Sequence, residues 1–302
     1  EEMLKTVKSP VLTHEQKVAA MASLADSLLE VLNLPEGVFS LLLVPIETQC
    51  ICDLFEGHAP MRPRYIIPDY GRFLKEGSSF LELGAPGDLY EAINALEIFY
   101  KHVPSVTNYP VYVGALDRLL EPFVSSMDEE EAYRLIRAFF IHILDSFSHG
   151  NIGPERTKAG SLILRAIAET KDAVPNMTMK YDASLTEDAF LLEAVRAALE
   201  SAKPSFANDA MFRSELGPEY VIASCYNGLP EGGGSYTLCR LILGNIAKRA
   251  KGIEDFLSRE LPYVMDLQAR YMDERIRFIV EESGFFENNF LAKEGFIRRE
   301  RF

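Results

Sequence analysis

Apolar side chains recur every three or four residues along much of the first half of the chain, which is the spacing of helices with one buried face. The clearest case follows a capping-box pattern formed by Thr13 and Gln16. Proline- or glycine-rich segments predict loops and turns between the helices. We predict helices over 14–32, from Asp88 to about His102, from about Ala115, from Asp128 and over 159–174, with loop-like segments at 57–71, 103–114 and 149–154.

The pattern changes after Pro175 to the alternation typical of strands. Met177, Met179 and Tyr181 fall on one face of residues 176–181, and polar side chains fall on the other. Strands that alternate with helices indicate parallel βαβ units. We predict further strands around 204–208 and 220–224, a helix from Thr186 to Ala202, and two helices after Ile253, the second over about 262–283. The predicted fold class is therefore α/β, with a mainly helical region over 1–158 followed by parallel βαβ units over 159–302.

The stretch from Tyr220 to Arg240 combines several features of a ligand site. A short apolar run ends just before Cys225, and Asn227 then opens a turn-forming segment. Three consecutive glycines, 232–234, precede Ser235, which we predict to cap a helix that contains Cys239. The order is strand, thiol, glycine loop and helix. A thiol at the end of a core strand, beside a loop without side-chain bulk, is well placed to meet a substrate.

Cys225 has three interpretations on these grounds. Most unpaired cysteines are small buried residues, which is how we interpret Cys239. As a nucleophile, Cys225 would need a base, and only His149 among the histidines lies in a glycine-rich segment. As a radical carrier, it would need a site closed to water. The glycine loop nearly has the spacing of a phosphate-binding loop, but Gly234 occupies the lysine position, which disfavours nucleotide binding.

Asparagines and one aspartate follow or border the predicted strands. In parallel sheets, ligands gather at the carboxyl ends of strands, but the same residue types also form turns. Cys50 and Cys52, with His58 nearby, are one possible metal-binding pattern. The usual zinc spacing is missing, so the pattern favours buried thiols and no bound metal. The residues concerned at the strand ends are Asn176, Asn208, Asp209 and Asn227.

Composition narrows the class of partners. A net charge of −14 disfavours nucleic acid and anionic membranes, which are themselves negative. Hydrophobic content of 48% with 25% charged residues is that of a folded globular protein. The apolar run 38–46 is too short to span a bilayer, and the first residues lack the pattern of a secretory signal. We therefore expect a cytoplasmic protein.

Segments spread through nearly the whole chain are similar, in the same order, to the YjjI-type glycyl radical enzymes of the pyruvate formate-lyase-like superfamily. These segments are 52–60, 63–70, 102–107, 151–154, 175–178, 224–227 and 285–288. The resemblance implies a ten-stranded barrel of two half-sheets wrapped by helices, in which a cysteine on one loop faces a glycine on another. By position, Cys225 matches that cysteine.

The resemblance also implies a chemistry, which belongs to anaerobic metabolism. An iron–sulfur, S-adenosylmethionine-dependent activase places a radical on the glycine, the radical passes to the cysteine, and the thiyl radical takes hydrogen from a small-molecule substrate. Tyr226 and Asn227 would shape the pocket, and His149, Asn151 and Asn176 are further candidates for substrate contact. The implied partners are the substrate and the activase, with a homodimer as an option, and no other cofactor is expected.

Two departures from the family pattern limit what can be transferred. The family's radical-bearing glycine lies beyond the position that matches Phe302, so we expect an N-terminal portion that is inactive alone. Ser224 and Tyr226 flank Cys225 where the pyruvate formate-lyase type has two adjacent cysteines, and Asn227 stands where the diol and choline eliminases carry a glutamate. The substrate stays open. The alternatives are a non-catalytic scaffold or binding module with an exposed barrel edge, and a cysteine-dependent hydrolase.

Overall fold

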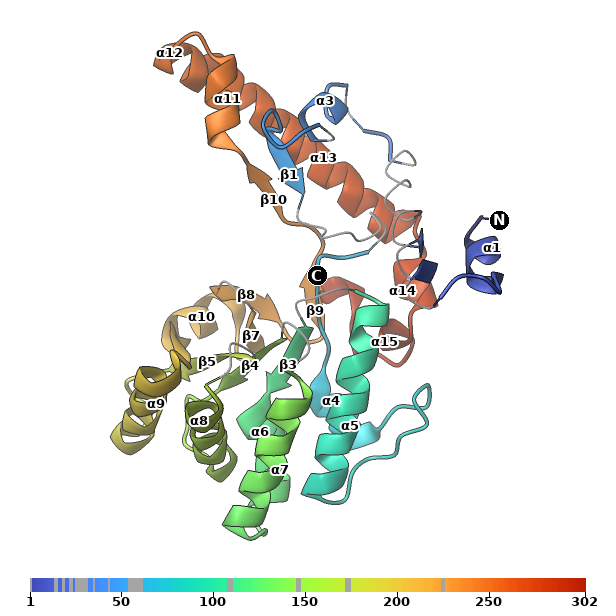
Figure 1. The fold of residues 1–302 in the computed structure, drawn as a ribbon. Helices are drawn as coiled ribbons and strands as arrows, with labels where there is room; N and C mark the ends of the chain where they lie inside the picture. The colour runs from blue at the N-terminus through green and yellow to red at the C-terminus, as the bar shows by residue number, and fades with distance from the viewer. Residues whose placement is uncertain are drawn as a thin grey trace. The chain divides into compact units, whose positions relative to one another are not determined.

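The chain forms two compact units, each described here by itself (Figure 1). One unit combines residues 1–64 with 235–287, and the other combines 65–234 with 288–302. Residue 158, where the sequence suggested a boundary, lies inside the second unit as the first residue of a helix. The computed structural model describes residues 2–13, 16–17, 20–21, 24, 32–34, 36–42, 44–53, 62–107, 111–144, 148–171, 175–223 and 226–302.

A parallel sheet of four strands organises the second unit. The strands are hydrogen-bonded in sequence order, and helices form the connections between them. This confirms the predicted parallel βαβ units, although a closed barrel is not seen. The strands are β3 (Val111–Ala115), β4 (Ser148–Ile152), β5 (Asn176–Tyr181) and β6 (Ser205–Asn208), and the helices are α6 (Leu116–Val124), α7 (Glu129–His142), α8 (Lys158–Thr170) and α9 (Asp188–Ser201).

The two faces of this sheet differ in chemistry. Met177 and Met179 are fully buried on the face toward α6–α9, and Gly150 keeps the neighbouring strand close to Met177. The opposite face carries Asn151, Thr178 and Lys180, which are also buried. In Figure 1, α6–α9 lie on one side of the sheet and a hairpin lies on the other. The alternation predicted over 176–181 is confirmed, and its polar face is an interior face.

Side-chain caps fix the helix starts that the sequence predicted. Asp88 accepts from the amide of Glu91 at 2.8 Å, and Asp128 caps α7 in the same way. Caps of this kind satisfy amides that have no partner inside the helix. The remaining elements of this part are α4 (Tyr70–Glu76), α5 (Leu89–His102), η2 (Val103–Ser105), α10 (Asp209–Leu216), α15 (Phe290–Lys293) and η5 (Arg299–Arg301).

An aromatic cluster holds α4, α5 and residues 288–302 together. The ring of Phe99 stacks on Phe73 with 4.2 Å between centroids and meets Tyr70 and Phe296 edge-on at 5.1 and 5.3 Å. These rings are almost entirely buried. Aromatic pairs in such geometries add stability beyond their buried area. Residues 288–302 therefore contribute to the core of the second unit.

The predicted strand before Cys225 is confirmed as β7 (Tyr220–Ala223), and all four of its residues are buried. It pairs antiparallel with β8 (Asn227–Pro230), with Ala223 opposite Asn227. After this hairpin, β9 (Gly233–Ser235) pairs with β2 (Tyr65–Ile67). A side chain at Gly234 would collide with the carbonyl oxygen of Tyr65. The glycines therefore permit close backbone packing, and no strand–loop–helix phosphate site is formed.

The other unit contains a long helix and a short antiparallel ribbon. Its described elements are α1 (Glu2–Lys8), α3 (Phe39–Leu42), β1 (Ile51–Asp53) paired with β10 (Cys239–Leu241), α11 (Leu243–Arg249), α12 (Ile253–Asp255), the π-turn η4 (Phe256–Glu260), α13 (Leu261–Glu281) and α14 (Phe285–Asn288). Val264, Leu267 and Tyr271 on α13 pack against Leu41 and Ile51. No helix in the described ranges is both long and apolar enough to cross a bilayer.

Three predictions from the sequence are wrong. Residues 148–152 form a buried strand, because their backbone pairs with β3 and β5 and the Asn151 side chain bonds to the backbone of Ile222. Together with β3, this strand makes the region before 158 a mixture of helix and strand. The helix predicted from Ser235 is replaced by strands, so Cys239 lies in β10, because pairing with β1 and β2 overrides the local helical spacing.

The capping box of Thr13 and Gln16 is present, with each backbone amide donating to the other residue's side chain. Most of the helix predicted after it lies outside the described residues, as do residues 57–61 of the predicted loop at 57–71. Within that loop, residues 65–67 form β2 and Tyr70 begins α4. Pairing with β9 supplies partners for the backbone of 65–67.

Candidate functional site

The polar face of the parallel sheet is covered by the β7–β8 hairpin, and Asn151 makes the central connection. Its side-chain nitrogen donates to the carbonyl oxygen of Ile222 at 2.8 Å, and its side-chain oxygen accepts from the Ile222 amide at 2.8 Å. Tyr112 donates to the same oxygen at 3.3 Å. All three residues are fully buried. The Asn151 amide therefore acts as a short piece of strand that binds β7 to the sheet.

The bonds to β7 also give its direction. The backbone oxygen of Tyr220 accepts from Lys180, whereas Ile222 bonds to Asn151. Asn151 is the register partner of Thr178, which lies two positions before Lys180 on β5. Thus β7 runs antiparallel to the sheet strands, from their carboxyl edge toward their amino edge. The end of β7 that leads to Cys225 points toward the amino edge.

The structure brings three predicted site residues to this polar face. His149 and Asn151 are both on β4, and Asn176 begins β5 as the register partner of His149. His149 and Asn176 lie at the amino edge, the edge toward which β7 runs. Burial lowers the pKa of His149 to about 4, so its ring is neutral at neutral pH. A neutral imidazole can both donate and accept a hydrogen bond.

Cys225 itself lies outside the described residues, so its surroundings are not described. Its neighbour Tyr226 has a φ of 62° and a side chain that is 53% exposed. Asn227 is exposed and pairs with Ala223 as the first residue of β8. The predicted pocket residues beside the cysteine are thus carried on a hairpin whose two strands are paired through four residue pairs.

An acidic residue follows the carboxyl end of each parallel strand. The four are Asp117 after β3, Glu155 after β4, Asp182 after β5 and Asp209 after β6. Asp117 and Asp209 are buried, Asp182 is partly buried and Glu155 is exposed. Of these, the sequence analysis selected only Asp209. Asp117 and Glu155 were missed because β3 and β4 were not recognised as strands, so their ends could not be located. Asp182 follows a strand that was predicted, but it was not selected.

Asp117 is a buried carboxylate that connects two strand ends. One of its oxygens accepts from the Gly153 amide at 2.7 Å, and the other accepts from the Arg118 amide at 2.8 Å. Burial raises the pKa of Asp117 to about 6, although these hydrogen bonds and the Arg118 charge oppose the rise. The carboxylate therefore fixes the turn after β4 to the start of α6.

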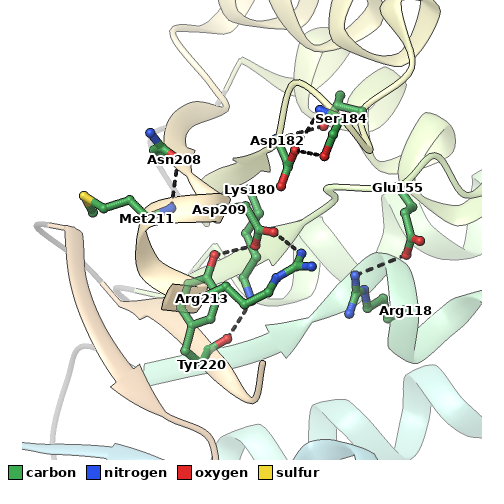
Figure 2. A network of polar contacts seen from close by, with 11 residues as sticks. Arg118, Glu155, Lys180, Asp182, Ser184, Asn208, Asp209, Met211, Arg213 and Tyr220 are labelled. Atoms are coloured by element: carbon green, nitrogen blue, oxygen red, sulfur yellow. Dashed lines mark hydrogen bonds and ion pairs between the residues drawn. The ribbon is translucent and has the colours of Figure 1, made fainter. Parts of the chain in front are cut away.

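A second polar network surrounds Tyr220 at the start of β7 (Figure 2). The Tyr220 hydroxyl donates to Asp209 at 2.5 Å, and Asp209 also forms an ion pair with Arg213. Lys180 donates to the Tyr220 backbone oxygen at 2.6 Å and lies over the Tyr220 ring. Burial, followed by the hydrogen bond to Asp209, raises the pKa of Tyr220. The base of the hairpin is thereby fixed to the carboxyl edge of the sheet.

Glu231 is a further, partly buried acid that the sequence analysis did not select. It follows β8, and its amide donates to the backbone oxygen of Glu219 at 3.1 Å. Burial raises its pKa to about 7, and the nearby negative charge of Asp69 adds to the rise while Lys180 opposes it. The same carboxylate contributes to the raised pKa of Tyr112. Glu231 is therefore an electrostatic neighbour of two residues on the polar face.

Asn208 does not face the network, because its side chain caps α10 by accepting from the Met211 amide at 3.0 Å (Figure 2). We expect Asn208→Ala to lower the free energy of unfolding by about 1 kcal/mol, the usual contribution of such a cap. Denaturant unfolding monitored by far-UV circular dichroism measures the change. Asn208→Ser, which can still cap, should stay close to wild type. Equal losses in both variants would contradict the capping role.

Cys50 and Cys52, the cysteines for which a metal site was considered, lie in the other unit. Cys50 is buried, which raises the pKa of its thiol, and Cys52 is partly buried on β1. His58 lies outside the described residues. Within the described part of the chain, no three His, Cys, Asp or Glu side chains are grouped closely enough to hold a metal ion.

Comparison with known proteins gives consistent matches over almost the whole chain. Residues 12–302 match the family described as "Glycyl radical enzyme YjjI-like". The chain is 49% identical to a protein of Haemophilus influenzae over 309 aligned positions, covering 100% of this chain and 59% of that protein. It is 44% identical to the protein YjjI of Escherichia coli K12 over 304 positions, covering 98% and 58%. The chain thus spans less than two thirds of the length of either relative.

Proposed function

The chain belongs to the YjjI-like glycyl radical enzyme family, and from this premise we propose that it supplies the cysteine hairpin and part of the substrate chamber of a glycyl radical enzyme. Cys225 is the hydrogen-abstracting residue in this proposal. The observation that carries it is the binding of β7 to the buried polar face of the sheet through Asn151. That connection holds the strand leading to Cys225 against the interior of the fold.

The architecture of the second unit supports a barrel in the full-length protein. The four parallel strands follow one another in sequence order. Their connecting helices lie on one side of the sheet (Figure 1). A sheet covered by helices on one side only can curve so that its other side faces inward. Here that other side is polar and already carries the hairpin, as expected for the inner surface of a reaction chamber.

The chemistry requires a radical source outside this chain. In the full-length protein, a glycine activated by an S-adenosylmethionine-dependent iron–sulfur enzyme supplies the unpaired electron. Cys225 gives the hydrogen atom of its S–H bond to that glycine, and its sulfur then takes a hydrogen atom from a C–H bond of the substrate. Each transfer moves one proton with one electron, so atoms and electrons balance. The return transfers restore both the thiol and the glycine radical.

Residues of the polar face would bind and orient the substrate. His149, neutral at neutral pH, and Asn176 lie at the edge toward which β7 runs, so both can hydrogen-bond a polar group there. Asn151 has a different role, because its amide is already used by the backbone of Ile222. We therefore regard it as a residue that positions the hairpin. Tyr226 and Asn227 flank the thiol on the hairpin itself.

A test that needs no substrate uses the exchange of thiol hydrogens with solvent. In the activated full-length protein in heavy water, each transfer from the Cys225 thiol puts a deuteron on the glycine carbon. The hydrogen splitting of the glycyl radical signal in electron paramagnetic resonance should therefore collapse. We expect Cys225→Ser to keep both the radical signal and its hydrogen splitting, because the stronger O–H bond blocks the transfer.

Cys239→Ser is the matched control, since Cys239 is a partly buried thiol on a strand of the same chain. Its signal should lose the splitting as the wild type does. A loss of splitting in Cys225→Ser at the wild-type rate would overturn the assignment. Retained turnover by Cys225→Ala, once a substrate is in hand, would overturn it as well.

A further inference from the structure

A small cavity lies at the carboxyl edge of the parallel sheet, beside the base of β7. Its volume is about 220 Å³, and Leu185 and Pro218 form an apolar part of its wall. Its charged lining consists of Arg118, Lys180, Arg213, Glu155 and Asp209. Three cations against two carboxylates leave a local excess of positive charge, although the chain as a whole has a net charge of −14. An acidic protein with a cationic cavity favours an anionic ligand there.

Lys180 supplies the strongest reason to expect such a ligand. Its side chain is buried, and its ammonium group donates to the Tyr220 backbone oxygen at 2.6 Å. An ammonium group has three N–H donors, so others are available to a ligand in the cavity. Burial of an ammonium group is costly, and the nearby carboxylates of Asp209, Glu231 and Asp117 offset part of that cost. An oxyanion in direct contact would offset more of it.

The two arginines of the cavity differ in how tightly they are held. Arg213 is bound to Asp209, which is itself buried and fixed by the Tyr220 hydroxyl. Arg118 meets Glu155 at 3.5 Å, and both side chains are at least half exposed. Exposed ion pairs of this length contribute little to the free energy of unfolding. Arg118 can therefore turn to a ligand at small cost, while Arg213 stays in place (Figure 2).

We propose that this cavity binds the carboxylate or phosphate group of a small molecule, with Lys180 and Arg118 as its donors and Arg213 supplying fixed positive charge. The site is at the opposite end of β7 from the end that leads to Cys225. It does not depend on the radical chemistry. Because Lys180 and Asp209 also hold Tyr220, a bound anion would strengthen the attachment of the hairpin base.

Proton linkage gives the proposal a distinctive signature. Burial, together with the charge of Arg118, lowers the pKa of Lys180 to about 8. An anion beside the ammonium group would raise that pKa again, so binding at pH near 8 should take up a fraction of a proton. Titration calorimetry in buffers with different ionisation enthalpies measures this uptake.

The experiment titrates the chain with propionate and, separately, with inorganic phosphate, and the two probes separate carboxylate from phosphate recognition. We expect at least one to bind with a Kd of about 1 mM, to take up protons near pH 8, and to bind about tenfold more weakly to Arg118→Gln. Lys180→Met should weaken binding at least as much and abolish the proton uptake. Arg118→Gln keeps the proposal testable if Lys180→Met does not fold.

Arg165→Gln is the matched control, because Arg165 forms ion pairs with Glu130 and Glu169 on the helix layer and does not line the cavity. Its affinity should equal that of the wild type. Failure of both probes to bind the wild type would overturn the proposal. Binding that is equal in wild type and Arg118→Gln would overturn it too. Neither result bears on Cys225, whose test reads the radical signal.

Discussion

Asn151→Leu should lower the free energy of unfolding by about 4 kcal/mol. The substitution keeps the number and branching of the side-chain heavy atoms but leaves the amide and the carbonyl of Ile222 without their partner. Each buried polar group left without a partner costs roughly 1–3 kcal/mol. Both residues are fully buried, so water cannot replace the lost bonds without opening the hairpin. Denaturant unfolding by circular dichroism suits the measurement, since the chain has no tryptophan.

The position of the effect matters as much as its size. Hydrogen exchange should show lost protection first in β7, because Ile222 is the residue that Asn151 binds. The Asn208→Ala variant serves as the matched control, as it changes an asparagine of the same sheet that only caps a helix. If Asn151→Leu cost no more than that control, Asn151 would not be what attaches the hairpin.

The sequence predicted the elements whose signals are local. Asp88 and Asp128 begin helices where expected, and the strands at 176–181 and 220–223 have nearly the predicted bounds. Capping and alternation depend on residues a few positions apart, so a single sequence contains them. The strand at 148–152 was missed because its backbone pairs with β3 and β5 and its Asn151 side chain bonds to β7, all of which are distant in sequence.

The same limit applies to the site. The sequence selected Cys225 and its neighbours from their place beside a strand and from a family resemblance. It could not show that Asn151 bonds to the backbone of the hairpin. Nor could it show that Lys180, in the interior of a strand, lies over the Tyr220 ring and donates to the Tyr220 backbone oxygen. It did not select Glu231, although this acid is partly buried and has a raised pKa. These roles arise from tertiary contacts, which no spacing in the sequence encodes.

Glu231→Gln should change how stability depends on pH. The pKa of Glu231 is raised from 4.5 to about 7 in the folded chain, so the folded state holds a proton that the unfolded state has lost over that range. Its contribution to the free energy of unfolding therefore falls as pH rises from about 4.5 to 7, by up to about 3 kcal/mol. A neutral glutamine removes this fall, so the variant should be more stable than wild type at pH 8 and similar at pH 4.5.

Measurement of unfolding in denaturant at several pH values isolates this group, because other carboxyls titrate equally in wild type and variant. The free energy of unfolding of Glu231→Gln should still fall somewhat as pH rises, because the pKa of Asp117 is raised to about 6. Glu219 provides the opposite control. Its pKa is lowered by a hydrogen bond from Arg301, so Glu219→Gln should lose stability above the usual carboxyl pKa. If the free energies of unfolding of Glu231→Gln and wild type differed by the same amount at every pH, burial would not disfavour the charged form of Glu231.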